Sequence, residues 1–203
     1  MSIKFYASSN ILVIGSSQTG KTTAVLKIVE QRLIEPMPTK IFYLYGAHQP
    51  FMEEWNKDKS KPPIRFIKGL NLEVVDQYVE PKLLIIDDLI LALNRDLAQH
   101  FIAGSHHKRT TTIFITHSLY LNNELYRLIS NNSQYILLFK NKRNFAQVAR
   151  LGRQILGSEY TRLTEAYKYI DSYAFVLLSF HPLVPEELLV TTGFFEPCLS
   201  AFM

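Results

Sequence analysis

The chain has 203 residues, 47% hydrophobic and 20% charged, and its 22 Lys and Arg against 18 Asp and Glu give a net charge of +4. With 8 Gly, 9 Pro and 12% aromatic residues, the composition is typical of a globular protein and excludes collagen-like, mucin-like and disordered chains. The single cysteine, Cys198, excludes an internal disulfide and a cysteine-based zinc site, and we interpret it as an apolar filler.

Short apolar runs alternate with longer, more polar stretches along the chain. The runs are four or five residues long and nearly all apolar, which predicts strands buried on both faces of a parallel sheet, at residues 11–14, 41–45, 83–87, 112–116 and 135–139. Between them the pattern predicts helices at residues 21–34, 72–79, 96–103, 119–129 and 145–156. This alternation predicts an α/β fold with a mainly parallel sheet and helices on both of its faces.

Two polar segments interrupt these elements, and a C-terminal stretch follows them. Residues 35–39 contain two prolines, which are expected to end the first helix, and residues 56–63 are expected to form a surface loop. Residues 159–203 predict a helix, an apolar strand beginning near Tyr173 and a Pro-Glu-Glu turn, which extend the same sheet. We therefore expect a single domain over residues 1–203, with a core at about residues 8–157 and a C-terminal extension at residues 158–203.

Residues 15–22 read Gly-Ser-Ser-Gln-Thr-Gly-Lys-Thr and fit the phosphate-binding motif G-x-x-x-x-G-K-[ST] in full. The motif follows a predicted strand and opens a predicted helix, as such a loop requires. Gly15 and Gly20 permit the tight wrap that points backbone N–H groups at phosphate oxygens. We expect Lys21 to reach the β- and γ-phosphates of ATP and the Thr22 hydroxyl to bind Mg²⁺. The predicted nucleotide-binding residues are Gly15, Ser16, Ser17, Gln18, Thr19, Gly20, Lys21, Thr22 and Thr23.

Residues 82–88 read Lys-Leu-Leu-Ile-Ile-Asp-Asp, which predicts a buried strand that brings carboxylates to the end of the sheet. We expect Asp87 to hold Mg²⁺ through water and Asp88 to polarise the attacking water. A hydrolytic NTPase needs this second acid, whereas small-molecule kinases usually do not. The alternative is an acidic strand-to-loop turn without a catalytic role.

The predicted strand at residues 112–116 ends in Thr116 and is followed by His117. If this strand lies between the strand before the phosphate-binding loop and the acidic strand, both side chains face the γ-phosphate and could sense hydrolysis. The alternative is a purely structural strand end.

Positive charge is concentrated in residues 104–153, where eight Lys and Arg against one Glu give a local charge of +7. This surplus suggests a polyanion contact, with a solvated face as the alternative. Adjacent histidines point in divergent directions, so His106 and His107 favour the positioning of Lys108 and Arg109 near phosphate over metal binding. Four residues compete for the role of an arginine finger, and the sequence does not rank them: Arg109, Arg127, Arg150 and Arg153.

Three blocks of this sequence together resemble the FtsK/HerA-type ATPases that package viral DNA. They are ILVIGSSQTGKTT, LLIIDDL and GSHHKRTTTIFITHSLYLNNELYRLISNNSQYILLFKNKRNFAQVARLGRQ. The resemblance is nearest to the poxvirus-like packaging ATPases of large DNA viruses, virophages and Polinton-type elements, and it runs from about Ile11 to Tyr173. The first two blocks are generic, whereas the Gly-x-His-His block and the strand pattern after Asn131 are more specific.

The resemblance implies a P-loop NTPase of the RecA-like, additional-strand type that binds ATP and Mg²⁺ through Lys21 and Thr22, with Asp87 and Asp88 as the Walker B acids. The candidate catalytic residues are Lys21, Asp88, His117, Arg109 and Arg127.

Three positions depart from the family pattern. His117 stands where relatives usually place glutamine, Ser105 stands where they often carry arginine, and Asp88 is shorter than the glutamate of many relatives.

These features predict a homo-oligomeric ring that hydrolyses ATP to drive double-stranded DNA into a preformed capsid, with a capsid or portal-vertex protein as partner. The expected contacts to DNA phosphates or to a neighbouring subunit are Lys108, Arg109, Lys142 and Arg143. A pump for single-stranded DNA, a nucleotide kinase and a nucleotide-gated binding protein remain as alternatives. Without a signal peptide or a run of about 20 apolar residues, we expect an intracellular protein in an infected host cell, with no membrane partner.

Overall fold

A computed structural model provides the structure of the chain and describes residues 4–104, 108–196 and 200–202. The interpretations of Ser105, His106, His107 and Cys198 concern positions outside these ranges. The strands are β1 (Phe5–Tyr6), β2 (Asn10–Ile14), β3 (Ile34–Glu35), β4 (Lys40–Tyr45), β5 (Arg65–Lys68), β6 (Lys82–Asp87), β7 (Thr110–Thr116), β8 (Tyr135–Phe139), β9 (Phe175–Ser179), β10 (Val190–Thr192) and β11 (Ser200–Ala201). The α-helices are α1 (Lys21–Glu30), α2 (Phe51–Trp55), α3 (Leu72–Asp76), α4 (Arg95–Gln99), α6 (Glu124–Asn131), α7 (Phe145–Leu156) and α8 (Thr161–Tyr169). Short 3₁₀ turns lie at Ile90–Ala92, Gly157–Glu159 and Glu186–Leu188, and a π-helical turn lies at His100–Gly104.

Nine strands of the described chain form one sheet in the order β11-β10-β9-β8-β2-β7-β6-β4-β5. The strands from β8 to β5 run parallel, and β9 to β11 add an antiparallel extension on the β8 side. Strand β7 lies between β2 and β6, as the expected role of Thr116 and His117 requires. The predicted α/β fold with an additional strand and a C-terminal strand extension is therefore confirmed.

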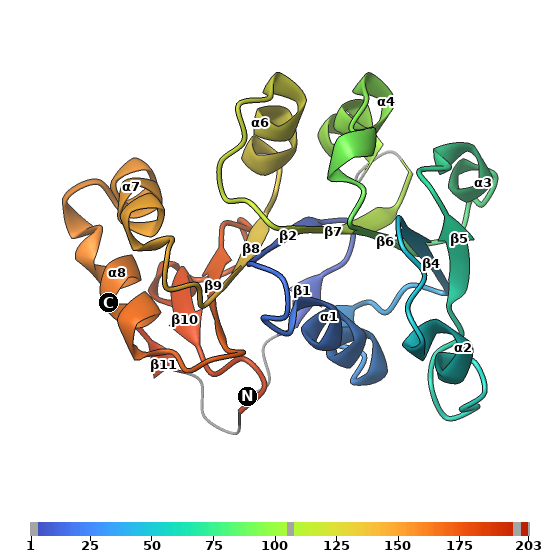
Figure 1. Cartoon of the computed structure of the whole chain (residues 1–203), viewed down its shortest axis with the longest axis horizontal. Helices are drawn as coiled ribbons and strands as arrows, with labels where there is room; N and C mark the ends of the chain where they lie inside the picture. The colour runs from blue at the N-terminus through green and yellow to red at the C-terminus, as the bar shows by residue number, and fades with distance from the viewer. Residues whose placement is uncertain (1–3, 105–107, 197–199, 203) are drawn as a thin grey trace.

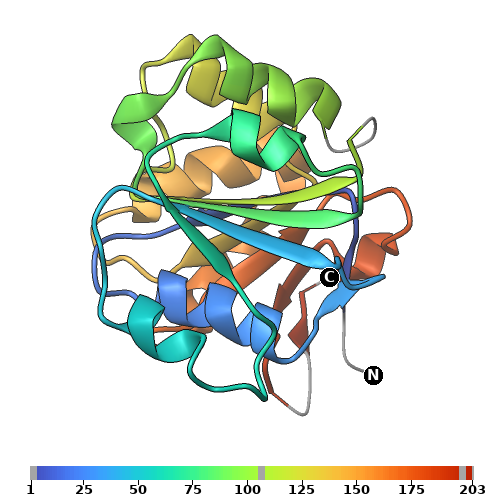
Figure 2. The ribbon, with the colours of Figure 1, turned by 90° about the vertical axis from the view of Figure 1, so that its right-hand side faces the viewer.

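Helices cover both faces of this sheet (Figures 1 and 2). Helices α3, α4 and α6 lie on one face and α1 and α2 on the other, while α7 and α8 lie beside the antiparallel extension. Side chains alternate along each parallel strand, so Leu12 and Ile14 join the core under α4 and α6 whereas Ile11 and Val13 join the core over α1. Two apolar faces explain why these strands are continuous hydrophobic runs in the sequence.

The first helix ends at Glu30, so the prediction that it extends to residue 34 is wrong. The N–H of Arg32 donates to the oxygen of Val29 and the N–H of Leu33 to that of Ile28, while Arg32 has a left-handed φ of 54°. This is the pattern of a Schellman motif, which closes a helix without a proline. The chain then enters β3, which pairs with β1.

Three other helices differ from their predicted limits. Helix α6 begins at Glu124 rather than residue 119, because the Asn123 side chain accepts hydrogen bonds from the N–H groups of Leu125 and Tyr126. Helix α3 ends at Asp76, three residues early. The helix predicted at residues 96–103 is divided into α4 and the π-helical turn that follows it.

Several short elements have no counterpart among the predictions, namely α2, β5, β10, β11 and the β1–β3 pair. Each is two to five residues long, which is too short for a clear periodicity. In the described ranges, no helix combines the length and the apolar character that a membrane crossing needs.

Candidate active site

The loop between β2 and α1 has a conformation that depends on its two glycines. Gly20 has φ 90° and ψ 11°, in the left-handed region. A Cβ atom on Gly15 would lie 2.7 Å from the Cβ of Phe139, so only glycine fits at that position. The Thr19 hydroxyl donates to the Ser16 oxygen across the loop at 2.8 Å. The backbone of the loop is therefore tightly wrapped just before the first turn of α1.

Lys21 begins α1 and points its ammonium group back into this loop. Its Nζ donates to the Ser16 oxygen at 2.7 Å and lies 3.3 Å from Nδ1 of His117. Burial lowers the pKa of Lys21, while the negative charges of Asp87 and Asp88 act in the opposite direction. A buried cation with nearby carboxylates is suited to bind a polyanion.

Asp87 ends β6 and is held by donors that converge on one of its oxygens. Its Oδ2 accepts from the Tyr43 hydroxyl at 2.6 Å, from Gln49 Nε2 at 3.3 Å and from the Thr22 hydroxyl at 3.5 Å. Burial raises the pKa of Asp87, and the hydrogen bond from Tyr43 partly offsets this. The carboxylate is thereby fixed beside the first turn of α1.

Tyr43 and Gln49 are site residues that no motif in the sequence indicates. Tyr43 lies in β4, which pairs with β6, and its side chain belongs to the same buried cluster as the apolar side chains of α1. The available signal was a tyrosine in a strand of otherwise nearly all apolar residues, because a buried hydroxyl usually requires a partner. Gln49 lies outside regular structure and gave no comparable signal.

His117 joins Lys21 to Asp88. Its Nε2 lies 3.2 Å from Asp88 Oδ1, and its Nδ1 faces the Lys21 ammonium group. An ammonium group can only donate and a carboxylate can only accept, so the neutral imidazole with its proton on Nε2 satisfies both contacts. Asp88 has a left-handed φ of 54°, and its oxygen lies so near Gly46 that a Cβ there would be 2.8 Å away. The turn therefore directs Asp88 toward His117.

The donor set fits a magnesium ion. The Thr22 hydroxyl and Asp87 carboxylate lie side by side, and hydroxyl and carboxylate oxygens are the hard ligands that Mg²⁺ prefers. Among the described residues there is no group of three or more His, Cys, Asp or Glu side chains that could form an all-protein metal site. An ion at this position would therefore need further oxygens from phosphate or water, as expected for a nucleotide-bound Mg²⁺.

The remaining predicted loop residues surround this centre. Ser17, Gln18 and Thr23 are exposed, and Ser16 supplies the oxygen that Lys21 contacts. Gln18 has a positive φ of 62°. The tip of the loop at Ser17 and Gln18 is therefore exposed to solvent.

Lys108 and Arg109 lie at the other end of the sheet from the phosphate-binding loop. They precede β7, whereas His117 follows it, and seven strand residues span about 20 Å. Lys108 donates to Asp76 at 2.6 Å, so its charge is already paired. Within one chain, the structure does not bring either residue to the site.

The other cations of the +7 segment point to different surfaces. Arg150 lies over the Tyr120 ring at 5.2 Å and Arg153 over the Tyr160 ring at 4.5 Å, both on α7. Arg127 and Arg150 line a cavity of about 860 Å³ between α6 and α7. The segment is therefore not a single basic patch.

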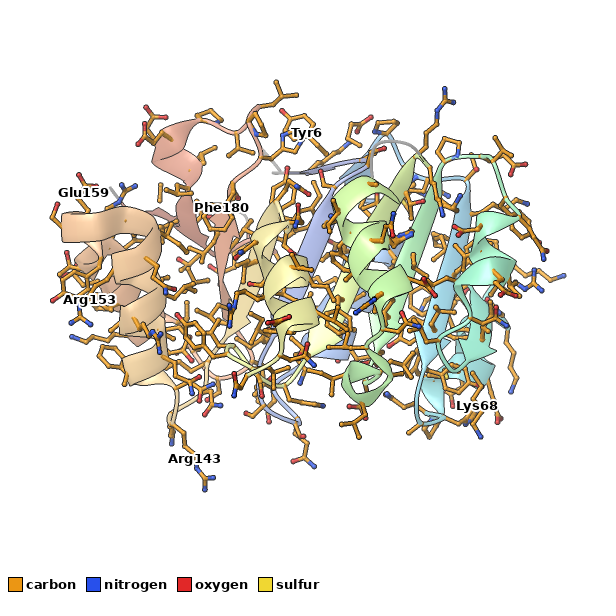
Figure 3. The ribbon with its side chains drawn as sticks, turned by 90° about the horizontal axis from the view of Figure 1, so that it is seen from above. Tyr6, Lys68, Arg143, Arg153, Glu159 and Phe180 are labelled. Atoms are coloured by element: carbon orange, nitrogen blue, oxygen red, sulfur yellow. The ribbon has the colours of Figure 1, made fainter. Side chains whose placement is uncertain are left out.

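The loop after β8 places two cations at the same end of the sheet as the phosphate-binding loop. Lys142 and Arg143 are both exposed, and Figure 3 shows Arg143 and Lys68 at this end, opposite Tyr6 and Phe180. Lys140 has a structural role instead, because its ammonium group donates to the oxygens of Tyr167 and Lys168 at the end of α8.

No family model matches this sequence, and no curated protein matches it. The fold is similar to that of B204, the DNA-packaging ATPase from Sulfolobus turreted icosahedral virus, with a TM-score of 0.59, 12% identity, and coverage of 91% of this chain and 96% of that chain. It is also similar to the genome packaging NTPase B204 from Sulfolobus turreted icosahedral virus 2 in complex with ATP-γS, with a TM-score of 0.55, 12% identity, and coverage of 87% and 95%. The same protein in complex with sulfate gives a TM-score of 0.55 at 12% identity, with coverage of 87% and 93%. At this identity the similarity establishes a common fold.

Proposed function

We propose that this chain is an ATP-driven motor that moves double-stranded DNA into a preformed viral capsid. The observation that carries the proposal is the convergence of Lys21, the first residue of α1, with Asp88 and His117, which follow the neighbouring strands β6 and β7, beside a complete phosphate-binding loop. The fold similarity to viral packaging proteins supports the choice of a DNA motor over other P-loop enzymes.

The proposed chemistry is hydrolysis of the γ-phosphate. Lys21 binds the β- and γ-phosphates, and Thr22 and Asp87 hold the Mg²⁺ that comes with the nucleotide. Bound Mg²⁺ supplies neutralisation of phosphate charge. Asp88 accepts a hydrogen bond from the attacking water and so orients and polarises it.

His117 positions Asp88 through its Nε2 proton and contacts Lys21 through Nδ1. When a γ-phosphate engages Lys21, the contact between the ammonium group and His117 has a competitor. His117 is therefore placed to transmit the presence or loss of the γ-phosphate to Asp88 and to β7. This is the sensor role that we propose for it.

The proposed partners are double-stranded DNA, further copies of the chain in a ring, and a capsid or portal-vertex protein. Lys142 and Arg143 are the proposed phosphate contacts at the nucleotide end of the sheet, because both are exposed there. Lys108 and Arg109 lie at the opposite end of the sheet, so they could contact only a neighbouring subunit or DNA that passes that end. As an arginine finger, Arg109 would likewise have to act on the nucleotide of a neighbouring subunit. Arg127 is the second finger candidate, exposed on α6. We propose that the protein acts in the infected cell.

The test is an ATPase assay with and without duplex DNA, run alongside light scattering to measure the size of the assembly. We expect duplex DNA to stimulate hydrolysis more than single-stranded DNA does. Lys21→Ala and Asp88→Asn should abolish single-turnover hydrolysis, while Asp96→Asn, an exposed aspartate on α4, should leave it unchanged. Hydrolysis that survives either of the first two substitutions would contradict the ATPase assignment, and stronger stimulation by single strands would favour a single-stranded DNA pump.

The DNA contact has its own test. Replacing Lys142 and Arg143 together with Glu should weaken stimulation by duplex DNA and reduce the salt dependence of binding by about one unit of slope per phosphate contact. Lys57 and Lys59, both exposed in the loop after α2, provide a control with the same change of charge. Equal effects of the two pairs would show that net charge, rather than this surface, governs DNA binding.

A further inference from the structure

Tyr173 places an exposed aromatic ring against the phosphate-binding loop. The residue lies in the turn between α8 and β9 and is 72% exposed. A Cβ atom built on Gly20 would lie 3.6 Å from Cδ1 of Tyr173 and 3.7 Å from its Cβ. Phe139 is also near Gly20 but is buried, so it supports the loop from the core side. Tyr173 therefore lies beside the loop at Gly20 and has a side chain that is largely exposed.

The backbone of this turn is held in place on both sides. The N–H of Ala174 donates to the Asp171 oxygen at 3.2 Å, and the N–H of Lys140 donates to the Ala174 oxygen at 3.2 Å. Tyr173 itself has a left-handed φ of 68°, which is uncommon for a residue other than glycine. The ring thus extends from a hydrogen-bonded turn that is attached to the end of β8.

The two sides of the phosphate-binding loop differ in chemistry. On the β7 and β6 side lie the charged and metal-binding groups, His117, Asp87 and Asp88. On the β8 and β9 side lies the Tyr173 ring, because β2 separates β7 from β8 in the sheet. A nucleotide whose terminal phosphates lie against the charged groups can therefore extend its base toward the aromatic side.

We propose that Tyr173 is the platform on which the base of the bound nucleotide stacks. This inference rests on the proposed nucleotide site and extends it to the part of the ligand that the phosphate-binding motif does not describe. An exposed tyrosine offers a flat apolar face that loses little side-chain freedom on binding. Stacking tolerates any base but gains from ring area, so purine nucleotides should bind more tightly than pyrimidine nucleotides, with little discrimination between ATP and GTP.

The test compares ATP with inorganic tripolyphosphate, which carries the phosphate chain without a base. Tyr173→Ala should weaken ATP binding about tenfold, as expected for the loss of one base–aromatic stack, and leave tripolyphosphate binding unchanged. Tyr173→Phe should bind ATP within about twofold of the unchanged chain. Tyr169→Ala is the matched control, because Tyr169 is a 79% exposed tyrosine at the end of α8.

Different outcomes separate this inference from the proposed function. Equal weakening of ATP and tripolyphosphate by Tyr173→Ala would overturn it, since the ring would then only support the loop, and so would unchanged ATP binding. Loss of DNA stimulation with unchanged ATP binding would assign Tyr173 to DNA and also overturn it. If the unchanged chain binds ATP more tightly than tripolyphosphate through Tyr173 but DNA does not stimulate hydrolysis, the inference stands and the motor proposal fails.

Discussion

His117 connects two charged groups on which the proposed hydrolysis depends, so His117→Ala should slow hydrolysis and leave nucleotide binding nearly unchanged. Its ring nitrogens lie 3.3 Å from Lys21 Nζ and 3.2 Å from Asp88 Oδ1. A hydrogen bond to a charged group contributes about 1.5–3 kcal/mol when buried. The side chains of His117 and Asp88 are 42% and 52% exposed, so we reduce each contact to about 1 kcal/mol. Losing both, about 2 kcal/mol, corresponds to about a 30-fold lower rate.

Single-turnover hydrolysis at saturating ATP measures this effect, and a separate titration measures nucleotide binding. His117→Gln replaces both contacts with an amide N–H and an amide oxygen, so it should retain a rate within about threefold of the unchanged chain. His48→Ala is the control, because His48 is half-exposed and pairs with Glu53 at the surface. A His117→Ala rate within about twofold of the unchanged chain would refute the reasoning, as would a Gln variant as slow as the Ala variant.

Three further substitutions test the groups around this centre. Lys21→Met should raise the free energy of unfolding of the ligand-free chain by about 1 kcal/mol in urea denaturation and abolish nucleotide binding, because the burial that lowers the pKa of Lys21 also destabilises its charged form. Tyr43→Phe removes a hydrogen bond that lowers the pKa of Asp87, so the acid limb of the pH–rate profile should move to higher pH, and an unmoved limb would contradict the role of Asp87. Burial keeps the folded-state pKa of Asp87 above its unfolded value. The protonated Asp87 side chain therefore favours the folded state at low pH, and this stabilisation is lost as the pH rises through the raised pKa. Gly15→Ala places a Cβ 2.7 Å from that of Phe139 and should lower the free energy of unfolding by about 1–3 kcal/mol, with loss of nucleotide binding.

The core of the fold was predictable because its strands are buried on both faces. Continuous apolar runs such as residues 83–86 leave little choice of structure, and Asp87 follows at the end where polar side chains meet. Helix limits were less predictable where the ending signal was unusual. Arg32 adopts the left-handed position that glycine commonly takes after a helix, so the sequence contained no marker for the end of α1.

The motif residues of the site could be predicted, whereas the groups that orient them depend on strand register. Asp87 meets Tyr43 only because β4 and β6 are neighbours that pair in one particular register. The concentration of positive charge in residues 104–153 also suggested a single contact surface, which the fold does not form. Lys108 and Arg143 both belong to the basic segment at residues 104–153, but β7, α6 and β8 lie between them and their charges are at opposite ends of the sheet.

The three donors that converge on one oxygen of Asp87 have an entropic consequence. A side chain that becomes ordered only on binding loses about 0.5–1.5 kcal/mol of rotational freedom. Asp87 is ordered by Tyr43, Gln49 and Thr22 within the folded chain, so this loss belongs to folding and not to ligand capture. The Asp87 carboxylate is therefore already ordered before a ligand binds. A substitution that destabilises β4 would weaken ligand binding by disordering the Asp87 side chain, although Asp87 itself is unchanged.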